Sequence, residues 1–333
     1  MGLTSIGDLA QSLVLKRQNT AAKADLQRLS TMLTTGKVTD ASTHLRGNLA
    51  PLAALDATLS RLEGYAQVTA EASRNAAAVQ DILGLVDKAT AGLGPALLTA
   101  GQGGAGSILT GAALQADQVL DQIVSALNTR VADRSLLAGV ADDRPALVDT
   151  ESLLAQAAAA VAGAVGAAGV DAALQDWLDD PAGFVAQAYR GDAPRAPLPV
   201  AEGEVARLDV TAADPALRGT LKGVLMGALL NRGVLAGQPQ ARADLARRAG
   251  ETLAESAPDR AHLAARVGIA QQRIEAAAAR NSAEATTLAM ARGGMVGVDG
   301  YDTATALQEA QTRLETLYTL TARLSRLNLS DYL

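Results

Sequence analysis

The sequence predicts a mainly α-helical protein. Long antiparallel helices from both chain ends form a coiled-coil stalk, and a mixed α/β insert lobe lies in the middle. Only 2% of the residues are aromatic, and Ala, Leu and Val supply most of the apolar fraction. This composition is typical of long helices packed at close distance. Leucines also recur three or four residues apart near both ends of the chain, which is the spacing of a helical face.

The first predicted helix covers residues 5–34 and carries two apolar faces. One face holds Ile6, Leu9 and Leu13, and the other holds Leu15, Ala22, Leu26, Leu29 and Leu33. The stretch "TTGKVTDAS" then interrupts the pattern. Gly36 is the predicted C-cap, and Asp40 or Ser42 is the predicted N-cap of the next helix.

A heptad pattern predicts a second, longer helix over residues 43–90. One seam position is occupied by Leu45, Leu52, Leu59, Ala66 and Ser73, and the other by Leu55, Leu62, Thr69, Ala76 and Leu83. Pro51 fits this helix only if it lies within the first turn, because proline lacks the N–H that a helix interior requires.

The remaining elements follow in order along the chain. Residues 91–107, "AGLGPALLTAGQGGAGS", are predicted to be a flexible break before a helix over 111–137. Residues 189–214 are the one stretch with the character of a hairpin. Further helices are predicted over 214–231, over 259–291 and from 302 to the end, with "RGGMVGVDG" interrupting the last two.

The apolar stripe of the last helix includes Leu307, Ala310, Leu314, Leu317, Leu324 and Leu327. Such a stripe requires a partner, and residues 5–34 supply one within the same chain. Two amphipathic helices bury little area by themselves, so the remaining apolar faces are predicted to contact neighbouring copies.

This pattern predicts three domains. Residues 1–42 with 295–333 form a terminal coiled-coil assembly domain, residues 43–147 with 258–294 form a helical rod domain, and residues 148–257 form a variable insert domain.

Composition narrows the classes of partner. The net charge of −6 and the pI near 5.1 argue against nucleic acid and against an anionic membrane surface. The absence of cysteine excludes disulfides and thiolate chemistry. The first residues lack the basic and apolar regions of a cleavable signal peptide, and no stretch is apolar enough for a transmembrane helix.

Motifs for catalysis are weak, and the sequence predicts no enzyme, cofactor or metal site. "GQGGAG" at 101–106 matches a dinucleotide-binding pattern, but a helix precedes it where a strand is required. His44 and His262 have no metal-ligand spacing. The acidic pairs Asp142–Asp143 and Asp179–Asp180 adjoin prolines in loops. If the chain nevertheless has a catalytic or ligand-binding function, it is a soluble helical enzyme or binding protein with its site in the insert, and this stays the alternative interpretation of the sequence.

Three segments resemble one family. "LNTRVADRSLLAGVADDRPAL" at 127–147 resembles the end of the first conserved block of hook–filament junction proteins in the flagellin superfamily. "LSTMLTTGKVTDAS" at 29–42 is similar to the turn after the terminal helix of that family, and "LNLSDYL" at 327–333 is similar to its ending. Departures occur at Ala132, Asp133, Ser135, Leu136 and Leu137, where the family favours small polar residues and aromatics, and at Ser330, where it has leucine.

The resemblance implies a secreted structural subunit of the bacterial flagellum that self-assembles at the hook–filament junction, with filament flagellin as the alternative. Its implied partners are copies of itself, neighbouring hook-associated protein and flagellin subunits, and an export chaperone on the C-terminal helix. Type III export without signal cleavage is also implied. The expected assembly interface consists of Ile6, Leu9, Leu13, Leu26, Leu29, Leu314, Leu317, Leu324, Leu327, Asp331, Tyr332 and Leu333.

Overall fold

The computed structural model describes residues 6–103 and 106–330 and divides into two compact units. Unit 1 consists of residues 1–63 and 282–333, and unit 2 consists of residues 64–281. Within the described residues the fold is mainly helical, with two small two-stranded antiparallel sheets. The predicted fold class is therefore confirmed.

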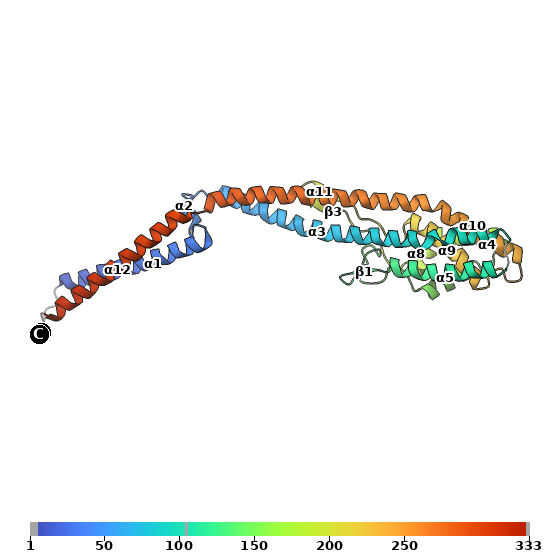
Figure 1. The fold of residues 1–333 in the computed structure, drawn as a ribbon, viewed down its shortest axis with the longest axis horizontal. Coiled ribbons are helices and arrows are strands. Elements are labelled where there is room, and N and C mark those ends of the chain that lie inside the picture. The colour runs from blue at the N-terminus through green and yellow to red at the C-terminus, as the bar shows by residue number, and fades with distance from the viewer. Residues whose placement is uncertain (1–5, 104–105, 331–333) are drawn as a thin grey trace. The chain divides into compact units, whose positions relative to one another are not determined.

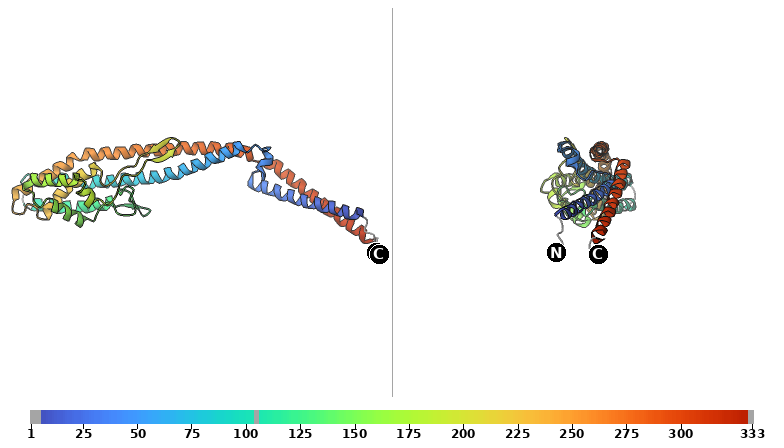
Figure 2. Two further views of the ribbon diagram at one scale, coloured as in Figure 1. Left: turned by 180° about the vertical axis from the view of Figure 1, so that it is seen from behind. Right: turned by 90° about the vertical axis from the view of Figure 1, so that its left-hand side faces the viewer.

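Unit 1 is built around two long helices, α1 (Ile6–Thr35) and α12 (Gly300–Ser330). They lie side by side in all views (Figures 1 and 2). The end of α1 lies at the beginning of α12, so the two helices run antiparallel. The predicted pairing of the two chain ends is thus present within one molecule.

The connections at this end are hydrogen-bonded to each other. Lys37 and Gly297 form an isolated antiparallel bridge. The Val38 N–H donates to the Val296 carbonyl at 2.9 Å, and the Val298 N–H donates to the Gly36 carbonyl at 3.1 Å. These bonds set the register in which α12 returns along α1.

Both predicted caps of this region are present. Gly36 follows α1 with φ +67°, a left-handed conformation that glycine adopts without strain, and its N–H donates to the Met32 carbonyl. Asp40 is the N-cap of α2 (Ala41–His44), and its carboxylate accepts from the N–H groups of Ser42 and Thr43.

The next helix, α3 (Ala50–Ala91), begins later than the predicted residue 43. The chain turns through Arg46 and Gly47, whose φ angles of 51° and 82° no helix contains. Pro51 consequently falls in the first turn of α3, where its missing N–H costs nothing.

One of the two predicted seams of α3 is correct and the other is shifted by one residue. Leu62, Thr69, Ala76 and Leu83 are buried as predicted, but the second row of buried residues is Ala72, Val79 and Val86 rather than Ala66 and Ser73. The prediction counted from Leu45, which lies outside the helix. Counting in steps of seven from Val79 and Val86 gives the observed row instead. These valines bury more apolar area than Ser73 does, so they decide which face of the helix is covered.

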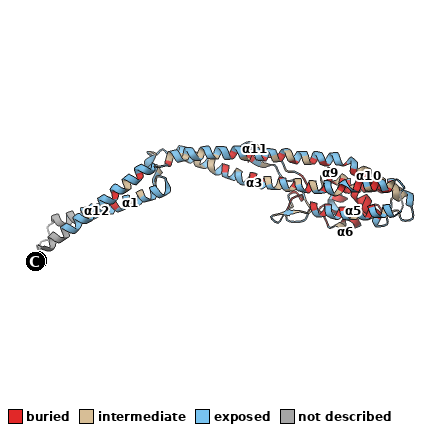
Figure 3. Cartoon of the chain, viewed as in Figure 1, coloured by how far each residue is buried: buried red, intermediate tan, exposed pale blue. Residues whose placement is uncertain are grey.

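Unit 2 contains the main hydrophobic core, as the concentration of buried residues on its helices shows (Figure 3). Its central helices are α4 (Leu93–Gly101), α5 (Gly106–Leu127), α9 (Pro215–Asn231) and α10 (Pro239–Glu255). The shorter helices α6 (Thr150–Ala160), α7 (Gly166–Asp179) and α8 (Phe184–Gln187) pack beside them.

Two predictions for residues 91–137 are wrong. Most of the expected flexible break is α4, because Leu93, Leu97 and Ala100 are buried against α5 and α10. The following helix ends at Leu127 rather than 137. Beyond it lies a tight hairpin, β1 (Arg130–Val131) with β2 (Arg134–Ser135), whose turn residues Ala132 and Asp133 have positive φ.

The expected insert shares its core with the preceding residues. Its hairpin, β3 (Leu198–Ala201) with β4 (Glu204–Ala206), lies where the sequence predicted it. However, α9 packs on α5, and α10 packs on α4. Residues 148–257 therefore belong to the same compact unit as residues 64–147.

Glycines allow α4 and α10 to approach closely. A Cβ at Gly250 would lie 2.8 Å from the Gly94 carbonyl oxygen and 2.7 Å from Leu98 Cγ. A Cβ at Gly101 would lie 2.6 Å from the Cβ of Arg247. These distances are too short for any side chain, so the packing of the two helices requires glycine at both positions.

We expect Gly250→Ala to destabilise unit 2 by about 1–3 kcal/mol, because the added methyl group forces α4 and α10 apart. Gly84 in α3 is the matched control, since nothing lies within 4 Å of a Cβ built there. Gly84→Ala should stabilise the protein by about 0.5–1 kcal/mol through helix propensity. Urea unfolding of both variants tests the contrast. Equal effects of the two substitutions would exclude close packing as the reason for Gly250.

Candidate assembly surface

The contact between α1 and α12 is only partly buried. Ala22 of α1 and Thr303 and Ala310 of α12 are buried in it. The leucines that flank them are half-buried: Leu15, Leu26, Leu29, Leu307, Leu314 and Leu317. We call these residues together the α1–α12 seam. Two helices can cover only one stripe of each other, so the seam stays open along its sides.

Large apolar side chains of the same two helices lie outside the seam and are exposed. Leu13 and Val14 of α1 are 55% and 52% exposed, and Tyr318 and Leu320 of α12 are each 46% exposed. Leu33 and Tyr301 are exposed as well. A single exposed leucine is common, but repeated ones on a helix pair indicate a surface that contacts another molecule.

The structure brings part of the predicted interface together. Leu26 and Leu29 lie in the seam with Leu314 and Leu317, whereas Leu13 faces solvent. Ile6 and Leu9 lie on α1, and Leu324 and Leu327 lie on α12, but the described part of the structure does not include their side chains. Asp331, Tyr332 and Leu333 lie outside the described residues.

Two polar residues at the helix pair were not found from the sequence. The ammonium group of Lys23 lies 5.6 Å from the centre of the Tyr318 ring, a cation–π contact between α1 and α12. Asn19 lies between Leu15 and Ala22 in the seam, and its Oδ1 is closed off from water without a hydrogen-bond donor among the described residues. Asn19 could have been noticed in the sequence, because it interrupts the apolar stripe between Leu15 and Ala22.

The turn after α1 depends on an ionised carboxylate. The hydroxyl of Thr43 donates to Asp40 at 2.5 Å, and this bond, with those from the N–H groups of Thr43 and Ser42, lowers the pKa of Asp40 below its ordinary value. A lowered folded-state pKa contributes stability that is present above the unfolded pKa and is lost as the pH falls through the folded one. The cap of α2 therefore weakens in acid.

The acidic pairs that suggested catalysis have structural partners. Asp142 pairs with Arg134 and Arg195, and Asp179 pairs with Arg218. Among residues 6–103 and 106–330 no group of three or more His, Cys, Asp or Glu side chains is arranged to hold a metal ion. Nor does that part of the chain include a helix long and apolar enough to span a bilayer.

A family comparison matches the C-terminal part of the chain. Residues 254–333 match the model described as the bacterial flagellin C-terminal helical region. This C-terminal part of the chain is flagellin-like. The matched residues contain all of α11 (Ala257–Val296) and α12. These two helices correspond to the last two helices that the sequence predicted.

No curated protein matches the sequence significantly. A solved structure of a protein assigned as a flagellar hook-associated protein from Vibrio parahaemolyticus matches with 13% identity and a TM-score of 0.48, covering 73% of this chain and 95% of that one.

The loop after α5 is filled with aliphatic side chains. Leu136 and Leu137 are buried. They are two of the positions at which the junction proteins that this segment resembles favour small polar residues and aromatics. Asn128 fixes this loop, because its amide donates to the Leu147 carbonyl at 3.1 Å and its Oδ1 accepts from the Leu147 N–H at 2.7 Å. The loop is therefore packed with leucine side chains in place of aromatic ones, and it remains well packed.

We expect Asn19→Leu to stabilise the α1–α12 pair by about 1–3 kcal/mol, because it removes a buried acceptor that has no donor. Gln18, its exposed neighbour on α1, is the matched control, and Gln18→Leu should change stability little. Hydrogen exchange of the α1 amides in each purified variant measures the effect. Slower exchange in both variants alike would show that general hydrophobicity, not the seam position, is responsible.

Proposed function

We propose that this chain is a structural subunit of the bacterial flagellum that self-assembles through α1 and α12. The observation that carries the proposal is the incomplete burial of these two helices, with half-buried leucines in the seam and exposed Leu13, Val14 and Leu320 beside it. Neighbouring copies would cover this surface, and each subunit in a ring or tube would repeat the contact.

The family match supports the same proposal from the sequence. Residues 254–333 match the flagellin C-terminal helical region, and that segment includes the whole of α12. Within the flagellum, we propose the hook–filament junction as the position of the subunit. The segments 29–42, 127–147 and 327–333, which resemble junction proteins, are the basis of this narrower proposal.

The proposal includes the three regions expected from the sequence. They are the terminal assembly domain, the helical rod domain of residues 43–147 with 258–294, and the variable insert domain of residues 148–257. In an assembly, residues 1–42 and 295–333 would form the contacts between subunits. The proposed partners are copies of this chain, adjoining hook-associated and flagellin subunits, and an export chaperone that binds the C-terminal helix. The proposed location is the extracellular flagellum, reached by flagellar type III export, and no enzymatic step is involved.

The triple variant Leu13→Gln, Val14→Gln and Leu320→Gln tests the assembly surface. These side chains are exposed in the single chain, so we expect its thermal unfolding to stay unchanged while its assembly is lost. Burial of each leucine or valine is worth roughly 1.5–3 kcal/mol, and every interface repeats that loss. Incorporation into flagella and swimming are measured in cells that lack the wild-type gene, together with the amount of protein secreted.

A matched triple variant of unit 2 is the control for added polarity. Leu114, Val140 and Val205 are 49%, 56% and 48% exposed, and their replacement by glutamine should affect neither secretion nor swimming. If the α1–α12 variant is secreted in normal amount and incorporated normally, the exposed side chains are not an assembly surface.

Immunogold labelling of intact flagella separates the two positions within the organelle. Label confined to the junction between hook and filament supports the junction subunit. Label along the whole filament would instead identify a filament flagellin, the alternative that the sequence left open.

A further inference from the structure

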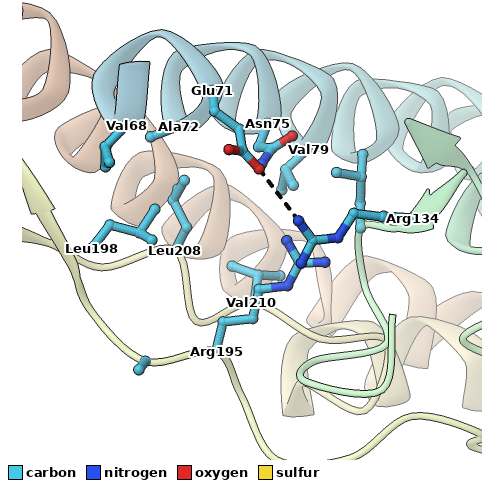
Figure 4. A pocket seen from close by; sticks show the side chains of 12 residues that line it. Val68, Glu71, Ala72, Asn75, Val79, Arg134, Arg195, Leu198, Leu208 and Val210 are labelled. Atoms are coloured by element: carbon cyan, nitrogen blue, oxygen red, sulfur yellow. Dashed lines mark ion pairs between the residues drawn. The ribbon is translucent and has the colours of Figure 1, made fainter. Parts of the chain in front are cut away.

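Unit 2 contains a cavity that the assembly role does not use. Its volume is about 290 Å³, and it lies between α3, strand β2 with the following Leu136, and the segments on either side of the β3–β4 hairpin, residues 195–198 and 207–210, which we call the β3–β4 strap (Figure 4). This volume lies just below the range of roughly 300–1,000 Å³ that is usual for small-molecule sites, so the cavity suits a small ligand.

The two ends of this cavity differ in chemistry. One end is aliphatic, with Val68, Leu198 and Leu208 drawn together on the side away from the arginines in Figure 4. The other end holds the guanidinium groups of Arg134 and Arg195, with the amide of Asn75 nearby on α3. A molecule with an apolar body and an anionic head would match this distribution.

Arg195 is anchored so that part of its guanidinium remains available. Its Nε donates to the Gly139 carbonyl at 3.1 Å, and its Nη2 donates to the Ser135 carbonyl at 2.8 Å and to Asp142 at 3.2 Å. Within the described part of the chain, its Nη1 has no acceptor. A fixed guanidinium with free N–H groups recognises an oxyanion at little entropic cost.

Arg134 has one weakly held nitrogen. Its Nε and Nη2 bind Asp142 at 2.7 and 2.6 Å, whereas its Nη1 lies 3.6 Å from Glu71, beyond hydrogen-bond distance. Both partners of the longer pair are 58% exposed, so solvent weakens it further. Asn75 has no hydrogen-bond partner for its side chain among the described residues, which adds a third available donor beside the two guanidinium groups.

We propose that this cavity binds a small aliphatic carboxylate, with its chain against Val68, Leu198 and Leu208 and its carboxylate on Arg134, Arg195 and Asn75. Glu71 competes with the ligand for Arg134 and turns to solvent on binding. This competition gives the proposal a directional test, because removal of the Glu71 charge strengthens binding if the proposal is right.

Isothermal titration of the full chain with sodium octanoate, below its micelle concentration at neutral pH, tests the site. We expect saturable binding of one molecule per chain. Octanol, which lacks the anionic head, and acetate, which lacks the apolar body, should each bind at least about tenfold more weakly, corresponding to about 1.4 kcal/mol.

Three variants locate the binding. Leu208→Trp fills the aliphatic end and should abolish it, Arg134→Gln should weaken it about tenfold, and Glu71→Gln should strengthen it. Leu114→Trp and Arg144→Gln are the matched controls, because both residues are exposed and lie outside the cavity lining. Circular dichroism melting confirms that each variant is folded.

Failure can be recognised at each step. Absence of saturable octanoate binding to the wild-type chain overturns the proposal without reference to any variant. Octanol binding as tight as that of octanoate overturns the role of the arginines. Weaker binding in Glu71→Gln overturns the competition between Glu71 and the ligand. None of these results affects the assembly proposal, which concerns α1 and α12.

Discussion

Two helices that pack only on each other cannot bury more than one stripe each, and unit 1 depends on such a pair. The α1–α12 seam buries Ala22, Thr303 and Ala310 but leaves its leucines half-buried. The hydrogen bonds between Val38 and Val296 and between Val298 and Gly36 hold the register at one end. Stability beyond that end has to come from further contacts, which is the physical basis for proposing assembly.

Unit 2 buries the apolar faces of its helices within one chain. Its central helices α4, α5, α9 and α10 each contact two or more other helices, so Leu97, Leu120, Leu225 and Leu229 are completely covered. Its most deeply buried arginine is fully paired. Arg260 is only 6% exposed, and its guanidinium donates to Asp87, Thr220 and Ser256 at 2.7–3.0 Å. A buried charge with these partners is satisfied, and the unit needs no other molecule for its core.

The sequence predicted long helices well, because helical periodicity over many residues is a strong signal. The caps at Gly36 and Asp40 and the hairpin after Pro197 were also predictable from local chemistry. Helix α4 was not predictable in this way. Residues 91–107 contain several glycines, which locally suggest a flexible break, yet Gly101 allows α10 to pack directly on α4. That reason lies in a helix far along the chain, so no local pattern could reveal it.

The assembly surface was predictable only in part for a similar reason. Spacing identified Leu26, Leu29, Leu314 and Leu317, which the structure places in the seam. Which leucines stay exposed depends on the register of α1 against α12, and the bridge between Lys37 and Gly297 sets that register. The cavity between α3 and the β3–β4 strap could not be predicted, because it combines residues from three separate parts of the chain.

The central claim is that unit 2 is complete in one chain, whereas the α1–α12 pair requires neighbours. Hydrogen exchange measured on the dilute single chain and on assembled flagella tests it most directly. The account predicts strong protection of α4, α5, α9 and α10 in both samples, and protection of α1 and α12 that rises sharply on assembly. Equal protection of α1 and α12 in the dilute chain and in the flagellum would contradict it.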